Sequence, residues 1–142
     1  MGITISCKKT GRSIDMGYGG FNNLRKKVAD LVGEPWSSHY HKLDFAPIFG
    51  DARKDFYEYF NAETKLLLEA KKVSVKIVDF CLQCDCEGSI RYGACKEILK
   101  AIGDYDDNIL YGYCGRPDCA MFKDFVAILK DCVENKCDMV WR

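Results

Sequence analysis

The sequence carries no excess of charge of either sign, because 21 lysines and arginines balance 21 aspartates and glutamates. Proteins that bind nucleic acid through its phosphates usually carry a basic excess, and proteins that imitate nucleic acid should be strongly acidic. The balance therefore counts against both classes. It leaves proteins and small molecules as the expected partners.

Long apolar runs are also missing. No stretch approaches the roughly 20 apolar residues of a membrane span. The first 20 residues are interrupted by Lys8, Lys9, Arg12 and Asp15, so they do not resemble a secretory signal. We therefore expect no membrane partner and a cytoplasmic location. In a reducing compartment the nine cysteines are expected to be thiols, most of them packed in the core.

Proline is scarce, with three residues in the chain and none between positions 48 and 116. This region is expected to hold a run of helices, over 52–71, 72–82 and 92–103, with a further helix over 119–134. Asn61-Ala62 is expected to interrupt the first of them. For residues 72–82 a strand remains the alternative to a helix, since Val73, Val75 and Ile77 alternate with polar residues.

Alternation of apolar and polar residues on both sides of Thr10-Gly11 predicts a β-hairpin over residues 3–18. A helix is expected to follow and to end at Gly33 and Pro35. Met139, Val140 and Trp141 are expected to form a last strand that pairs with the hairpin. With 142 residues, 48% of them apolar, the prediction is one α+β domain over residues 1–142. The domain is expected to contain a small antiparallel sheet, made of the hairpin and the C-terminal strand, that packs against four to five helices. A further short strand is expected over 109–113.

Cysteine spacing raises the question of a metal site. Cys81 and Cys84 have the spacing of a zinc-binding pair, and Cys114 with Cys119 could supply two more ligands. The second pair is more widely spaced than usual, so we expect core packing and no cofactor. A structural zinc module with these four ligands stays open as an alternative.

The chain has only two histidines, His39 and His41. On an extended segment they would point the same way, which suits acid–base chemistry or metal binding. An enzyme that uses this pair is therefore a further alternative. No hydrolase, zinc-protease or kinase signature accompanies them, so no enzymatic activity is expected.

Two sets of residues are candidates for binding. Basic side chains and glycine-rich turns before helices favour phosphate, and they indicate a site for a nucleotide-like small molecule: Lys8, Lys9, Arg12, Tyr18, Gly19, Gly20, Tyr113 and Arg116. Residues 34–50 are rich in aromatics and are expected to form an exposed loop or short strand. Its interface candidates are Trp36, His39, Tyr40, His41, Phe45 and Phe49.

Three stretches carry a resemblance to known proteins. They are Gly2-Ile3-Thr4-Ile5 with residues 9–18, Asp85-Cys86-Glu87-Gly88-Ser89-Ile90 with residues 95–98, and residues 122–132 with Met139-Val140-Trp141. Together they resemble a group of small proteins from phages and prophages of Gram-positive bacteria, over nearly the whole chain. The resemblance implies no catalytic residues. It implies the host cytosol as the location and core packing for Cys86, Cys95 and Cys132.

These observations favour a non-enzymatic binding protein that antagonises a host protein, such as a component of immune defence, by direct contact. The alternative is a protein that sequesters a nucleotide signal. The sequence does not decide the oligomeric state, and a homodimer is compatible with it.

Overall fold

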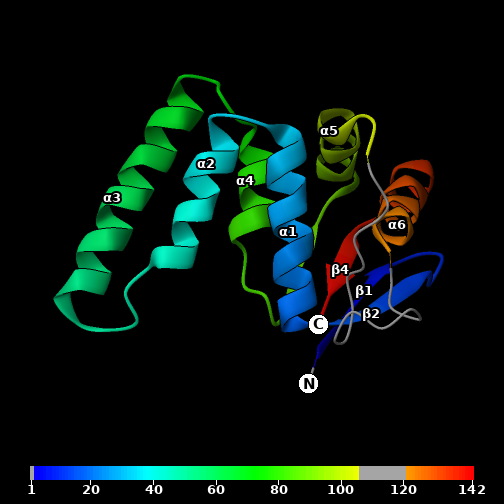
Figure 1. The fold of residues 1–142 in the computed structure, drawn as a ribbon. Coiled ribbons are helices and arrows are strands. Elements are labelled where there is room, and N and C mark those ends of the chain that lie inside the picture. Colours follow the sequence, from blue (N-terminus) through cyan, green and yellow to red (C-terminus); the bar gives the residue numbers. More distant parts are fainter. Residues whose placement is uncertain (1, 106–120) are drawn as a thin grey trace.

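A computed structural model describes residues 2–105 and 121–142 and shows an α+β fold (Figure 1). Its elements are β1 (Gly2–Cys7), β2 (Ser13–Gly17), α1 (Tyr18–Val32), α2 (Trp36–His41), the 3₁₀ helix η1 (Lys42–Phe45), α3 (Gly50–Glu69), α4 (Val75–Leu82), β3 (Gly88–Ile90), α5 (Tyr92–Ile102), α6 (Phe122–Asn135) and β4 (Met139–Trp141).

The four strands form one antiparallel sheet in the order β2-β1-β4-β3. The hairpin pairs Ile5 with Ile14, and the same Ile5 lies beside Trp141 of β4. The predicted hairpin and its pairing with the C-terminal strand are therefore confirmed. The sequence pattern did not indicate β3, which pairs with β4 and places Gly88 opposite Trp141.

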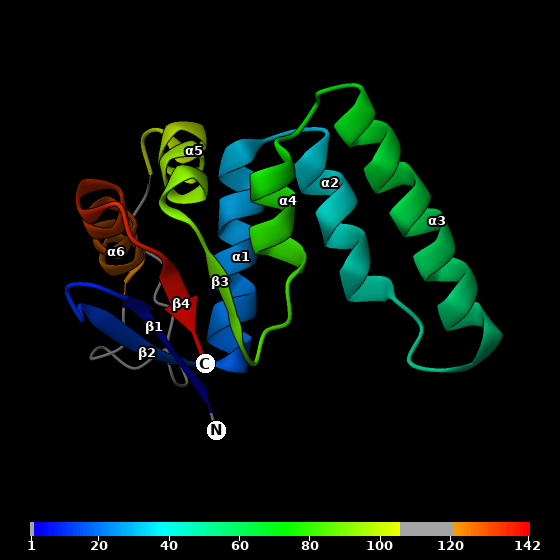
Figure 2. The same cartoon turned by 180° about the vertical axis from the view of Figure 1, so that it is seen from behind.

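Alternation gives the sheet one buried and one polar face. The buried face carries Ile3, Ile5, Cys7, Met16, Ile90, Met139 and Trp141. It contacts α1, α4 and α6, and α5 packs against α6 and α1 behind it (Figures 1 and 2). On the outer face the Thr4 hydroxyl donates to the Asp15 carboxylate across the two hairpin strands, at 2.6 Å.

Several local expectations need correction. Residues 36–45 are helical rather than a loop or strand, and α3 runs without a break through Asn61-Ala62. Residues 75–82 are helical, in agreement with the favoured interpretation, and α5 matches the predicted 92–103 helix. The strand expected over 109–113 lies outside the described residues.

Helix α3 stands at the edge of the molecule, far from the sheet and beside α2 (Figures 1 and 2). Of its twenty residues only Phe60 and Thr64 are buried. We call α3 the arm, because one side of it packs on the rest of the protein while the other faces solvent.

Candidate functional site

The segment that leads into the arm exposes three large apolar side chains. Phe45 is 84% exposed, Ile48 is 81% exposed and Phe49 is 80% exposed. We call these three residues the tip. The guanidinium of Arg53 donates to the carbonyl of Pro47 at 3.0 Å, so the first turn of the arm holds the segment that carries the tip.

Three of the six predicted interface residues are not at the surface. Trp36, His39 and Tyr40 are at most 5% exposed and belong to the core. The expectation that they form an exposed aromatic segment is wrong, because α2 is a helix and turns them toward α3 and α4. Phe45 and Phe49 do lie at the surface, and His41 is partly exposed.

Charged residues around the tip are balanced in sign. Three are basic and three are acidic: Lys42, Arg53, Lys54, Asp44, Asp51 and Asp55. Lys42 contacts Glu63 at 2.6 Å, and Asp44 contacts Lys26 at 2.8 Å. Surfaces that bind anionic lipid carry clusters of basic residues, so this arrangement fits a protein partner better than a membrane.

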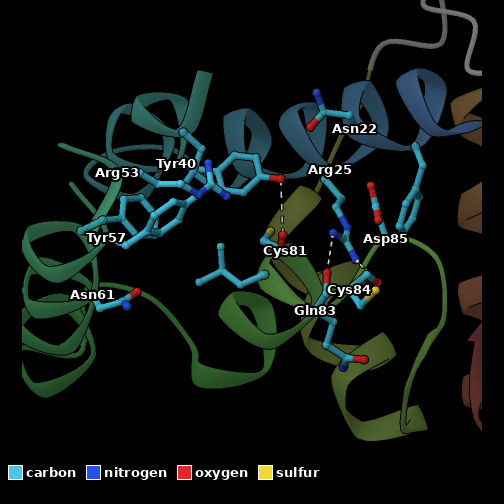
Figure 3. A pocket seen from close by; sticks show the side chains of 14 residues that line it. Asn22, Arg25, Tyr40, Arg53, Tyr57, Asn61, Cys81, Gln83, Cys84 and Asp85 are labelled. Atoms are coloured by element: carbon cyan, nitrogen blue, oxygen red, sulfur yellow. Dashed lines mark hydrogen bonds between the residues drawn. The ribbon is translucent and has the colours of Figure 1, made fainter. Parts of the chain in front are cut away.

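A groove of about 630 Å³ lies between the arm on one side and helices α1 and α4 on the other (Figure 3). Its volume lies within the range of ordinary ligand pockets. The lining comes from α1, α2, η1, α3, α4 and the segment after α4, and includes Asn22, Arg25, Tyr40, Arg53, Tyr57, Asn61, Cys81, Gln83, Cys84 and Asp85. None of the described residues that line the groove is a histidine, so the groove does not contain a histidine acid–base pair.

Arg25 lines this groove and is buried. Its guanidinium donates to the carbonyls of Gln83 at 2.8 Å and Cys84 at 3.4 Å, and it lies 4.2 Å from the centre of the Phe21 ring. Burial lowers the pKa of Arg25. Its contacts join α1 to the segment after α4, which gives this arginine a clear structural role.

The residues predicted to bind a nucleotide-like ligand do not form one patch. Lys8 and Lys9 are exposed at the hairpin turn, where Arg12 pairs with Asp131 at 2.7 Å. Tyr18, Gly19 and Gly20 lie beyond the other end of β2. A five-residue strand spans roughly 17 Å, so the cations and the glycines are separated. Tyr113 and Arg116 lie outside the described residues.

The two histidines also fail to converge. In a helix, side chains two positions apart point to different sides, and α2 turns His39 inward and His41 outward. The Nε2 atom of His39 lies 2.7 Å from the Thr64 hydroxyl, whose own proton goes to the Phe60 carbonyl, so Nε2 is the donor. The His41 ring contacts Asp30 at 2.7 Å. The alternative of a catalytic histidine pair is therefore not supported.

Burial lowers the pKa of His39, and the nearby Glu63 carboxylate opposes the shift without cancelling it. Below its ordinary pKa of 6.5, His39 of the unfolded chain takes up a proton that the folded protein resists. The free energy of unfolding should therefore fall as the pH drops below 6.5, by up to about 1.4 kcal/mol per pH unit. Urea unfolding at pH 7.5, 6.5 and 5.5 measures this loss.

A matched pair of variants isolates the contribution of His39. His39→Gln should flatten the decline over this pH range, whereas His41→Gln should retain it. A decline of equal size in the wild type and in His39→Gln would contradict the assignment.

The predicted zinc ligands are only partly described. Cys81 is in the core, where burial raises the pKa of its thiol to about 12. Cys84 is exposed, and its sulphur lies 2.8 Å from that of Cys86. Cys114 and Cys119 lie outside the described residues. The sequence-based reasoning missed a different group of thiols, Cys7, Cys132 and Cys137, for which the only sequence signal is the pair at 132 and 137.

Comparisons with protein-family models, curated proteins and solved structures found no match. Among the described helices, none has both the length and the apolar character required to cross a membrane.

Proposed function

We propose that this protein is a non-enzymatic binding protein that inserts its tip into an apolar groove of another protein. The observation that carries the proposal is the exposure of Phe45, Ile48 and Phe49, each at least 80% exposed within five consecutive residues. Burying one such side chain contributes about 1.5–3 kcal/mol. Aromatic anchors of this kind dominate the energetics of protein interfaces.

The position of the tip supports this role. It lies at the end of the arm, and Arg53 holds the carbonyl of Pro47 in place, which limits the conformational freedom that binding would have to remove. The arm carries a further exposed aromatic side chain, Tyr59. The partner that fits is a protein with an apolar groove and a mixed-charge rim.

The resemblance to phage and prophage proteins suggests the source of that partner. We take it to be a protein of a Gram-positive host cell that is inhibited when its surface is occupied. A site for a nucleotide signal is the less favoured function, because its predicted residues on the hairpin and on α1 lie apart.

Replacing both phenylalanines of the tip tests the proposal. Phe45→Ser/Phe49→Ser should weaken partner binding by at least about 100-fold, since two buried aromatic anchors are removed. Both side chains are exposed, so the stability of the free protein should barely change. Affinity capture from a Gram-positive lysate identifies the partner, and calorimetry with the purified partner measures the dissociation constant.

The matched control is Tyr92→Ser, which removes an exposed aromatic side chain on α5 in the body of the protein. It should bind as the wild type does. Equal binding by the tip variant would overturn the proposal, as would failure of the wild type to retain any stoichiometric partner. Self-association or vesicle binding that disappears in the tip variant would also overturn it, because the tip would then serve a second copy or a lipid surface.

A further inference from the structure

Three cysteines that are far apart in the sequence meet at one end of the sheet. The sulphur atoms of Cys7, Cys132 and Cys137 all lie within 4.8 Å of one another, and those of Cys7 and Cys137 are 3.2 Å apart. Four sulphurs at the usual bond length from a tetrahedral zinc ion are separated by roughly 3.8 Å. The three thiols therefore already have nearly the spacing of one face of such a site.

The backbone holds two of these cysteines together. Lys136 has a left-handed conformation, with φ of 50°, immediately after α6. The N–H of Cys137 then donates to the carbonyl of Cys132 at 3.1 Å, and that of Lys136 donates to Val133 at 3.4 Å. This helix-ending motif brings the side chains at 132 and 137 to the same place.

The third cysteine is held by the turn of the hairpin. Cys7 is the last residue of β1, and its carbonyl accepts from the N–H of Gly11 at 3.0 Å. The N–H of Cys7 donates to the carbonyl of Arg12 at 2.9 Å across the same turn. Backbone hydrogen bonds on both sides of Cys7 therefore fix its position at the end of β1.

A fourth thiol lies next to Cys132. Cys95 of α5 is fully buried, but its sulphur is not among the three that all lie within 4.8 Å of one another, so it would have to move toward them to complete a tetrahedral set. Structural zinc sites are almost always closed by four protein ligands. The burial of Cys7, Cys95 and Cys132 agrees with a closed site rather than one that admits a substrate.

We propose that Cys7, Cys132 and Cys137, with Cys95 as the fourth ligand, bind one zinc ion that fastens β1, α5 and the end of α6 together. Each thiol releases its proton to solvent as its sulphur binds the metal, and no electrons are transferred. The ligand set differs from the one that spacing alone suggested, which paired Cys81 and Cys84 with Cys114 and Cys119. The proposal is independent of the function assigned to the tip.

Metal content is the first test. Protein produced with added zinc and purified under reducing conditions without chelator should contain about one zinc per chain. Replacing any one of the four ligands with serine should lower the zinc affinity at least about tenfold. The variants are Cys7→Ser, Cys95→Ser, Cys132→Ser and Cys137→Ser. Cys81→Ser and the double variant Cys84→Ser/Cys86→Ser are the matched controls and should retain the metal.

Cobalt provides a spectroscopic test that reports the ligand set directly. Titration of the metal-free wild type with Co²⁺ should produce the intense visible absorption of a tetrahedral thiolate complex, and zinc should remove it. Cys137→Ser alters the least buried of the four ligands, so it should fold and give a weaker, shifted spectrum. Circular dichroism checks the fold of each variant.

Three results would overturn the proposal. They are less than ~0.2 zinc per chain in the wild type, a cobalt spectrum unchanged in Cys137→Ser, and a wild-type mass that is lower by two hydrogens with Cys7 linked to Cys137. The last result would show that the close pair forms a disulfide. Unaltered zinc affinity in Cys95→Ser would refute the assignment of the fourth ligand.

Discussion

Trp141→Ala should lower the free energy of unfolding by about 3–5 kcal/mol, the usual cost of truncating a large buried aromatic side chain. Trp141 is 1% exposed and packs against Phe21 and Phe80, with ring centres 5.6 and 5.8 Å away. Its indole N–H donates to the Cys84 carbonyl at 3.0 Å, and the Arg25 guanidinium lies 5.6 Å from its ring. The substitution removes all of these contacts at once.

Urea unfolding followed by circular dichroism measures this loss. Trp141→Phe should cost less, because a ring remains between Phe21 and Phe80. Val140→Ala is the matched control on the same strand, since Val140 is only partly buried, and its effect should stay below about 1.5 kcal/mol. A loss of less than about 1 kcal/mol in Trp141→Ala would show that the packing of this side chain contributes little to stability, contrary to the prediction.

Gly88→Ala should destabilise the protein by about 1–3 kcal/mol or more, the range for forcing extra atoms into a packed core. A Cβ atom on Gly88 would lie 2.3 Å from Cζ2 and 2.5 Å from Cε2 of Trp141. The ring is held by Phe21 and Phe80 and cannot easily withdraw. The cost is therefore steric, and thermal or urea unfolding will detect it.

Gly19→Ala is the matched control, because a Cβ atom there would meet nothing within 4 Å. Gly19 lies in the first turn of α1, where alanine should be neutral or stabilising by up to about 1 kcal/mol. A double-mutant cycle makes the test sharper: in the Trp141→Ala background, Gly88→Ala should cost less, since only the flexible end of the Gln83 side chain, at 2.6 Å, still opposes the new Cβ atom. An equal cost in both backgrounds would falsify the steric explanation.

Much of the fold could be predicted from periodicity. Alternation identified the hairpin and the strand at 139–141, and breaks at glycine and proline located α1 and α5. The β3 strand was missed because its three residues become a strand only by pairing with β4, which follows some fifty residues later. The helix at 36–41 was missed although Trp36 and Tyr40 have helical spacing, because their aromatic character was interpreted as exposure.

The candidate sites were harder to predict than the fold. The exposure of Phe45 and Phe49 agrees with the sequence-based expectation. Nothing in the sequence, however, distinguishes these two residues from Trp36 and Tyr40, which are buried in the core. The thiol group depends on contacts between β1, α5 and the end of α6. Local spacing can reveal only the pair at 132 and 137, and it cannot bring Cys7 to them.

The position of β4 has a consequence for the order of events during synthesis. This strand is the last element along the described chain, yet it lies between β1 and β3 inside the sheet. β4 must therefore emerge from the ribosome before β3 can join the hairpin, and the ring of Trp141 packs against Phe21 and Phe80 only at that point. Until then the growing chain exposes apolar faces of α1, α4 and β1, and exposed surface of this kind favours aggregation during synthesis.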